Sequence, residues 1–305
     1  MVAPSICRFI GSRPSIEGCD IVLVGIPYDG TASFRSGARF GPREVRAYSD
    51  EGMEDFSFHS GRGLDEIAFF DIGDLPLMVG NPGLMVREVK KAALELMVGS
   101  PDVAPGGEGE SHKTAYELTL TNRRLLSVGG EHLITYPLFL ALKEVYSDFT
   151  IIQLDAHADL RERYAGDHLS HSSVMKLCLQ EGLKKLVQYG IRSGTRDEYK
   201  LRRQEPRIIP AANIGDIEAS LKEGELVYLS VDLDFFDPAY LPGTGTPEAG
   251  GHSFRDYLDV LKVLKAKKIH CIGADVVELA PDIDPTKAST VFAAEVIRET
   301  LLLLG

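Results

Sequence analysis

Short runs of apolar and often β-branched residues recur along the chain. Most of these runs are apolar at every position, a pattern typical of strands that are buried on both faces of a parallel sheet. The predicted strands are 21–26, 67–72, 125–128, 150–154, 186–191, 226–231 and 269–276.

The segments between these runs have helical periodicity. In 84–98, for example, Val86, Val89, Ala93 and Leu96 fall on one helical face. The predicted helices are 84–98, 136–145, 172–181, 254–265 and 289–304. Alternating strands and helices predict an α/β fold in which helices cover both faces of a central parallel sheet.

Nothing in the sequence divides the chain into separate units, because it contains no internal repeat and no low-complexity tract. The stretch 99–111, GSPDVAPGGEGES, is rich in glycine, proline and acidic residues. It is too short to separate two domains, and it is predicted to be a surface loop. We therefore expect residues 1–305 to form a single domain.

Composition narrows the possible partners. The formal net charge is -12, which disfavours nucleic acid and suits a cationic small molecule, although acidity alone also serves solubility. No apolar run approaches the ~18 residues of a membrane span, and the N-terminus lacks the apolar core of a signal peptide. The four cysteines form no C-x-x-C pair, which argues against zinc-finger and thioredoxin-like sites. A cytoplasmic protein with no membrane partner is expected.

Side chains that commonly bind metals follow three of the predicted strands. The segments are GGEH at 129–132, DAHAD at 155–159 and DLD at 232–234. In parallel sheets, functional groups gather where strands end at their carboxyl edge. Alternate residues of an extended segment point the same way, so Asp155, His157 and Asp159 can share one side, and Asp232 and Asp234 another.

Four carboxylates and two imidazoles cannot crowd together as bare groups, because desolvated like charges repel. Divalent cations would neutralise the cluster. Mixed oxygen and nitrogen ligands suit Mn²⁺, with Fe²⁺, Co²⁺, Ni²⁺ or Zn²⁺ as alternatives, and six ligands favour two ions over one. A lone D-x-D is more often a turn or helix cap, but three such motifs that each close a strand favour a metal site. The candidate ligands are His132, Asp155, His157, Asp159, Asp232 and Asp234.

These motifs resemble the ureohydrolase family, which comprises arginases, agmatinases and their relatives. The likeness includes GGEH at 129–132, DAHADL at 155–160 and SVDLDFFDPA at 230–239. It extends to IPYDGTASFRSGARFGPREVR at 26–46, GTGTPEAGG at 243–251 and GADVVEL at 273–279. It covers nearly the whole chain, with the motifs in family order.

The resemblance implies a three-layer α/β/α fold of the arginase/deacetylase type and two Mn²⁺ ions per subunit. It assigns one ion to His132, Asp155, Asp159 and Asp232, and the other to Asp155, His157, Asp232 and Asp234. Asp155 and Asp232 would then bridge the ions, and bound cations would lower the pKa of a water nucleophile. Relatives commonly form homo-oligomers, either trimers or hexamers.

The same resemblance implies two catalytic residues. His171 matches the histidine that shuttles protons to the leaving amine, a role that fits a near-neutral pKa. The nearby His168 is a rival. Glu278 matches the acid that binds the substrate guanidinium, whose forked donors require a carboxylate. His252 could contact substrate or face solvent, and the second is favoured.

The loops around the metals determine the specificity for the end of the substrate that lies away from the guanidinium. Arginases carry an Asn two residues beyond the last Asp of D-x-H-x-D, where this chain has Arg161, and LRERYAGDHLSH at 160–171 lacks the arginase pattern. The segment resembles that of agmatinases, which implies hydrolysis of agmatine to putrescine and urea. If Arg161 points into the site, it favours a guanidino acid such as 4-guanidinobutyrate or 3-guanidinopropionate.

Guanidinobutyrase, guanidinopropionase and arginase activities therefore remain alternatives. A deacetylase-like hydrolase would predict one metal and fewer carboxylates. A non-catalytic metal-binding homologue would predict a broken ligand set, whereas all six ligand positions are filled.

Overall fold

The computed structural model describes residues 7–98 and 123–305. Within them, eight parallel strands form one sheet in the order β4-β1-β5-β10-β9-β6-β7-β8. The strands are β1 (Ile21–Ile26), β4 (Phe69–Asp74), β5 (Arg124–Gly129), β6 (Thr150–Leu154), β7 (Lys185–Tyr189), β8 (Ile208–Ala211), β9 (Leu226–Asp232) and β10 (His270–Val277). A short antiparallel pair, β2 (Phe56–Ser57) and β3 (Arg62–Gly63), lies outside this sheet.

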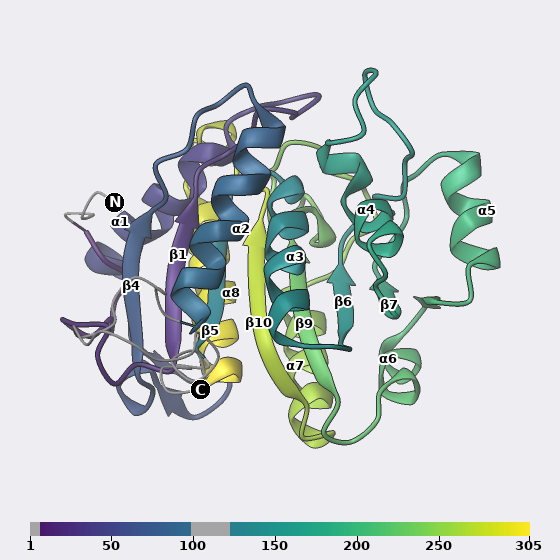
Figure 1. The fold of residues 1–305 in the computed structure, drawn as a ribbon. Helices are drawn as coiled ribbons and strands as arrows, with labels where there is room; N and C mark the ends of the chain where they lie inside the picture. The colour runs from purple at the N-terminus through teal and green to yellow at the C-terminus, as the bar shows by residue number, and fades with distance from the viewer. Residues whose placement is uncertain (1–6, 99–122) are drawn as a thin grey trace, which may run out of the picture.

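Helices cover both faces of the sheet, as Figure 1 shows. The helices are α1 (Gly41–Gly52), α2 (Pro82–Val98), α3 (Thr135–Val145), α4 (Val174–Gln180), α5 (Arg196–Gln204), α6 (Ile214–Ser220), α7 (Phe254–Ala266) and α8 (Ala288–Leu304). Residues of α1, α6, α7 and α8 share one hydrophobic core, and residues of α2, α3 and α4 share the other. The predicted three-layer α/β/α architecture is confirmed. No helix within the described part of the chain is both long and apolar enough to span a bilayer.

Strand β1 explains why the apolar runs do not alternate with polar residues. Ile21 and Leu23 pack into the core on the α8 side, while Val22, Val24 and Ile26 pack into the core on the α2 side. Successive strand residues point to opposite faces, so a sheet covered on both faces needs an apolar residue at every position.

The structure adds elements that the periodicity did not predict. Strand β8 and helices α1, α5 and α6 were missed, and β4 begins two residues later than the predicted strand 67–72. The predicted surface loop at 99–111 lies outside the described residues.

A buried ion-pair cluster joins α1 to β4. Arg46 is 1% exposed, and its Nε and Nη2 donate to the two carboxylate oxygens of Asp71 at 2.7 and 3.0 Å. Arg46 also pairs with Asp74. This guanidinium neutralises the carboxylate of Asp71, which has no access to water.

Replacing Arg46 with leucine is expected to lower the free energy of unfolding by about 3–5 kcal/mol, because the substitution leaves Asp71 buried without its partner. Urea denaturation measures the change. Arg43→Leu, on the exposed face of the same helix, is the matched control and should alter stability by less than about 0.5 kcal/mol. Equal losses in the two variants would contradict a special role for the buried pair.

Candidate active site

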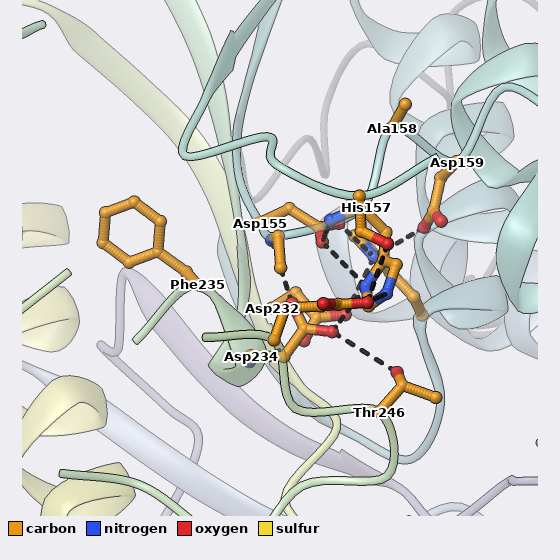
Figure 2. Close-up of polar contacts among 12 residues, drawn as sticks. Asp155, His157, Ala158, Asp159, Asp232, Asp234, Phe235 and Thr246 are labelled. Carbon is orange, nitrogen blue, oxygen red and sulfur yellow. Dashed lines mark hydrogen bonds and ion pairs between the residues drawn. The ribbon is translucent and has the colours of Figure 1, made fainter. Parts of the chain in front are cut away.

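The three motifs converge because their strands lie near one another in the centre of the sheet. Strand β10 separates β5 from β9, and β9 pairs directly with β6. The eight strands of this sheet run parallel, so the segments after β5, β6 and β9 emerge at the same carboxyl edge, as expected. Figure 2 shows the resulting cluster of aspartates and histidines.

A glycine directs the chain from β5 into this cluster. A β-carbon at Gly130 would lie 2.0 Å from the carbonyl oxygen of Tyr28. Only glycine permits this close backbone approach, after which the amide of Glu131 donates to the same carbonyl at 2.7 Å. His132 follows immediately and is fully buried.

The Nδ1 atom of His132 faces three carboxylates. It lies 3.0 Å from Asp155 Oδ2, 3.0 Å from Asp159 Oδ2 and 3.2 Å from Asp232 Oδ2. All four side chains are at most 6% exposed. Segments separated by up to 100 residues thus deliver four ligand-type side chains to one buried point.

The opposite ring atom of His132 identifies its tautomer. Nε2 lies 2.9 Å from Ser230 Oγ, whose hydroxyl donates to Asp275 Oδ1 at 2.8 Å. A serine hydroxyl has one hydrogen, so Ser230 must accept from His132 Nε2–H. In the neutral imidazole, Nδ1 then carries a lone pair, and this buried atom has no hydrogen-bond partner among the described residues.

Asp275 is held in place on β10 by further hydrogen bonds. Its Oδ2 accepts from Tyr228 Oη at 2.7 Å and from Thr135 Oγ1 at 2.8 Å. The motif analysis gave no role to Asp275 or Ser230, because their contact depends on the pairing of β9 with β10. Support of this kind orients histidine ligands in metalloproteins.

A second group of ligand-type atoms adjoins the first. His157 Nδ1 lies 2.7 Å from Asp234 Oδ2 and 3.8 Å from Asp155 Oδ1. Asp155 thus belongs to both groups, which are His132 with Asp155 and Asp159, and Asp155 with His157 and Asp234. Asp232 lies beside them, with its Oδ1 accepting from the amide of Asp234 at 2.9 Å.

The donor set fits divalent cations. A lone pair on His132 Nδ1 that faces carboxylate oxygens is repulsive unless a proton or a metal cation lies between them. Burial lowers the pKa of His132, but its contacts with Asp155, Asp159 and Asp232 raise it well above the usual value, so the cluster attracts positive charge. Burial, together with Asp234 and Asp159, raises the pKa of Asp155 to about 7. Oxygen and imidazole ligands in two adjoining groups suit two ions of the Mn²⁺ or Zn²⁺ type.

Two of the candidate residues have left-handed backbone conformations, which are uncommon outside glycine. Asp159 has φ of 53° and Glu278 has φ of 69°. The carbonyl of Asp159 also accepts hydrogen bonds from the amides of Met175 and Lys176, at 3.1 Å each, which fixes it at the start of α4. Backbone strain of this kind clusters at functional sites.

A cavity of about 370 Å³ opens over the cluster. Both residues that the sequence nominated for catalysis, His171 and Glu278, line it. His168, the rival of His171, is 60% exposed beside Asp167 and is not among the lining residues.

Glu278 lies where β10 ends and is 8% exposed. Its Oε1 accepts from the backbone amide of His132 at 2.9 Å. Burial, together with Glu131 and Asp234, raises the pKa of Glu278 to about 8. An arriving cation would favour its ionised form.

His171 sits in the wall between α4 and the loop after β1. Its ring is edge-on to Tyr164, with centroids 5.4 Å apart. Its Nδ1 lies 3.3 Å from Thr31 Oγ1, and its Nε2 lies 3.4 Å from Ser33 Oγ. Burial lowers the pKa of His171, which favours a neutral imidazole near pH 7.

Arg161 lines the cavity, but Glu198 compensates its positive charge. Its Nε lies 3.5 Å from Glu198 Oε2, and its guanidinium lies 5.2 Å from the ring centroid of Tyr164. Glu198 is 4% exposed and accepts from the amides of Leu160 and Thr195, at 3.0 and 2.7 Å. The carboxylate that compensates Arg161 is therefore fixed in position.

The expectation that His252 faces solvent is wrong. Its ring stacks on Phe235 with centroids 4.4 Å apart and an interplanar angle of 8°. Tyr189 lies on it as well, at 4.5 Å. The aromatic neighbours come from β7 and from the turn after β9, which the local sequence around His252 does not reveal.

A parallel α/β fold with buried Asp and His clusters at the carboxyl edge of its sheet defines a class of metal-dependent proteins, and comparisons with known proteins identify the family. The model of the Arginase family matches residues 19–303. An agmatinase of Halalkalibacterium halodurans is 36% identical over 301 residues, covering 96% of this chain and 95% of that protein. An agmatinase of Bacillus cereus is 36% identical over 307 residues, with the same coverage.

The same family appears among solved structures. A candidate agmatinase from Clostridium difficile has a TM-score of 0.83 and 32% identity, and the match covers 95% of this chain and 98% of that one. The chain belongs to the arginase family. The resemblance to ureohydrolases that its motifs carry is confirmed, as is its assignment to hydrolases of guanidino compounds.

Proposed function

We propose that this protein hydrolyses the guanidinium group of agmatine to give putrescine and urea, and that its site holds two Mn²⁺ ions. The observation that carries the proposal is the convergence of two adjoining ligand groups, Glu278 and His171 on one cavity. The proposed ligands are His132, Asp155, His157, Asp159, Asp232 and Asp234. Bound divalent cations lower the pKa of water and so supply a nucleophile near neutral pH.

Glu278 is the proposed partner of the substrate guanidinium. Its buried carboxylate has one oxygen fixed by the amide of His132, which leaves the other to accept from a forked N–H donor. A planar cation bound there would lie beside the ligand groups, because Glu278 follows β10, between β5 and β9. The carboxylate thus binds the substrate and orients its central carbon.

His171 is the proposed proton carrier. Cleavage of the C–N bond requires a proton on the departing amine nitrogen, and a cavity-lining imidazole can deliver it. The pKa of His171, lowered by burial, lets the ring return to its neutral form after each transfer.

The charged residues around the cavity favour a substrate that is cationic at the end away from the guanidinium. Among its described lining residues, Glu198, Glu248 and Glu278 stand against Arg161. Glu198 compensates Arg161 and Glu278 is the proposed partner of the guanidinium, so Glu248 remains to favour a second positive charge on the substrate over a carboxylate. The curated relatives described above are agmatinases, which agrees with this preference.

The activity is tested by urea release from agmatine, L-arginine and 4-guanidinobutyrate, with the protein loaded with Mn²⁺ or treated with chelator. We expect kcat/KM for agmatine to exceed the other two by on the order of 10²-fold, because a carboxylate tail would meet the carboxylate of Glu248. Chelation should abolish urea release, and Mn²⁺ should restore it.

Each result bears on a different part of the proposal. Faster hydrolysis of 4-guanidinobutyrate would show that Arg161, despite Glu198, selects a guanidino acid. Urea release from none of the three compounds would refute the proposed activity. We also propose that the protein is cytoplasmic and that it forms a homo-oligomer, either a trimer or a hexamer. Light scattering of the purified protein tests the oligomeric state.

A further inference from the structure

A hydroxyl group from the first loop of the chain reaches the ring of His171. Thr31 follows β1, 140 residues away from His171 in sequence. Its Oγ1 lies 3.3 Å from His171 Nδ1 and accepts from the backbone amide of His171 at 3.1 Å. One side chain therefore holds both the backbone and the ring of the proposed proton carrier.

Thr31 is itself held by Glu131. The Thr31 hydroxyl lies 2.6 Å from Glu131 Oε1, and the Thr31 amide donates to Oε2 at 2.8 Å. Glu131 is 0% exposed. Burial raises the pKa of Glu131 to about 7, although the two hydrogen bonds from Thr31 lower it. The proposed reaction assigns no role to Thr31 or Glu131.

The hydrogen bonds that link Glu131, Thr31 and His171 fix the tautomer of the His171 ring. Glu131 accepts from Thr31 with both oxygens, Oε1 from the hydroxyl and Oε2 from the amide, so the single hydroxyl hydrogen of Thr31 goes to Glu131. Thr31 Oγ1 can then only accept from the imidazole. The hydrogen of the neutral ring must lie on Nδ1, and Nε2 is left with its lone pair.

We propose that Thr31 and Glu131 are positioning residues that hold His171 in its Nδ1–H tautomer, with the Nε2 lone pair beside the Ser33 hydroxyl and able to take up a proton. This inference rests on the proposed role of His171. The Ser230 hydroxyl orients His132 in a similar way: it donates to Asp275 and accepts from Nε2–H of the imidazole. Both histidines are thus oriented by a hydroxyl that is committed to a buried carboxylate.

The first test compares Thr31→Val with Thr31→Ser. Valine keeps the shape of threonine but cannot accept from Nδ1, so kcat should fall about 10- to 100-fold while KM and metal content stay unchanged. Serine restores the hydroxyl and should recover kcat to within about threefold of wild type. A fall in kcat that serine does not rescue, or an effect confined to KM, would overturn the proposal.

The second test uses Glu131→Gln. The backbone amide of Thr31 can only donate, so the glutamine must turn its carbonyl toward that amide and its NH₂ toward the Thr31 hydroxyl. The hydroxyl is then free to donate to Nδ1, which reverses the tautomer. We expect a loss in kcat similar to that of Thr31→Val, and a double variant no worse than either single one. Additive losses would mean that the two residues act independently.

Ring ¹⁵N NMR chemical shifts of histidine-labelled protein report the tautomer directly. The His171 signals, identified by their loss in His171→Ala, should indicate Nδ1–H in wild type and not in Glu131→Gln. An Nε2–H tautomer in wild type would refute the inference whatever the kinetics.

Thr150 provides a matched control. Its hydroxyl also contacts a glutamate, Glu225, but it begins β6 and so lies at the edge of the sheet opposite the cavity. Thr150→Val should leave kcat within about twofold of wild type. If His171→Ala is inactive but Thr31→Val is not, only this inference fails; if His171→Ala retains full kcat, the proposed role of His171 fails first.

Discussion

Replacing Asp155 with asparagine is expected to remove bound metal from both ligand groups and to lower kcat for urea release by at least about 10³-fold. Asp155 is the residue that the two groups share. Both of its oxygens also accept hydrogen bonds, from Gln153 Nε2 and from the amide of His157, at 2.6 Å each. The NH₂ group of an asparagine would face one of these donors, so the substitution disturbs the site's support as well as its charge.

Metal content per subunit, measured by inductively coupled plasma mass spectrometry alongside urea release, checks this result. Asp197→Asn is the matched control, because the side chain of Asp197 is 93% exposed, and it should retain metal and activity. An Asp155→Asn protein that still binds two ions and keeps kcat within tenfold would contradict the proposed shared ligand.

Replacing His171 with alanine should lower kcat by on the order of 10²-fold or more while metal content stays intact. The ring lines the cavity, and its polar contacts are with the hydroxyls of Thr31 and Ser33 rather than with the ligand atoms. Loss of the ring therefore removes a proton carrier without opening the metal groups.

His168→Ala is the control, three residues away and with a mostly exposed side chain. It should leave both kcat and metal content near wild type. Loss of metal in His171→Ala would make His171 a ligand, and an equal loss of kcat in the two variants would attribute the effect to the loop rather than to the ring.

The central sheet could be predicted from sequence because its strands are buried on both faces. Strand β8 was missed for the opposite reason: it is an edge strand of four residues that contains Pro210 and is only partly buried. Proline interrupts strand patterns except at edges. Helix α5 was missed because its sequence, RDEYKLRRQ, is almost entirely polar, so it lacks the apolar stripe that periodicity detects.

The site residues that could be predicted are those whose pattern lies within one short segment of the sequence. The metal-type residues are adjacent in sequence within each motif, so spacing and strand position revealed them. The direction of Arg161 could not be predicted, because it depends on Glu198, which helix α5 supplies. The contacts of Ser230 with Asp275 and of Thr31 with His171 likewise join segments that only the folded chain brings together.

The position of β9 has a consequence for how the protein matures during synthesis. A growing chain that has not reached residue 226 already contains His132, Asp155, His157 and Asp159, but β6 still lacks the strand that pairs with it in the centre of the sheet. Asp232 and Asp234 arrive with β9, and Glu278 arrives only after β10. Full loading with metal should therefore come late, after most of the polypeptide has left the ribosome, so that nascent chains stalled earlier carry an incomplete and weakly binding centre.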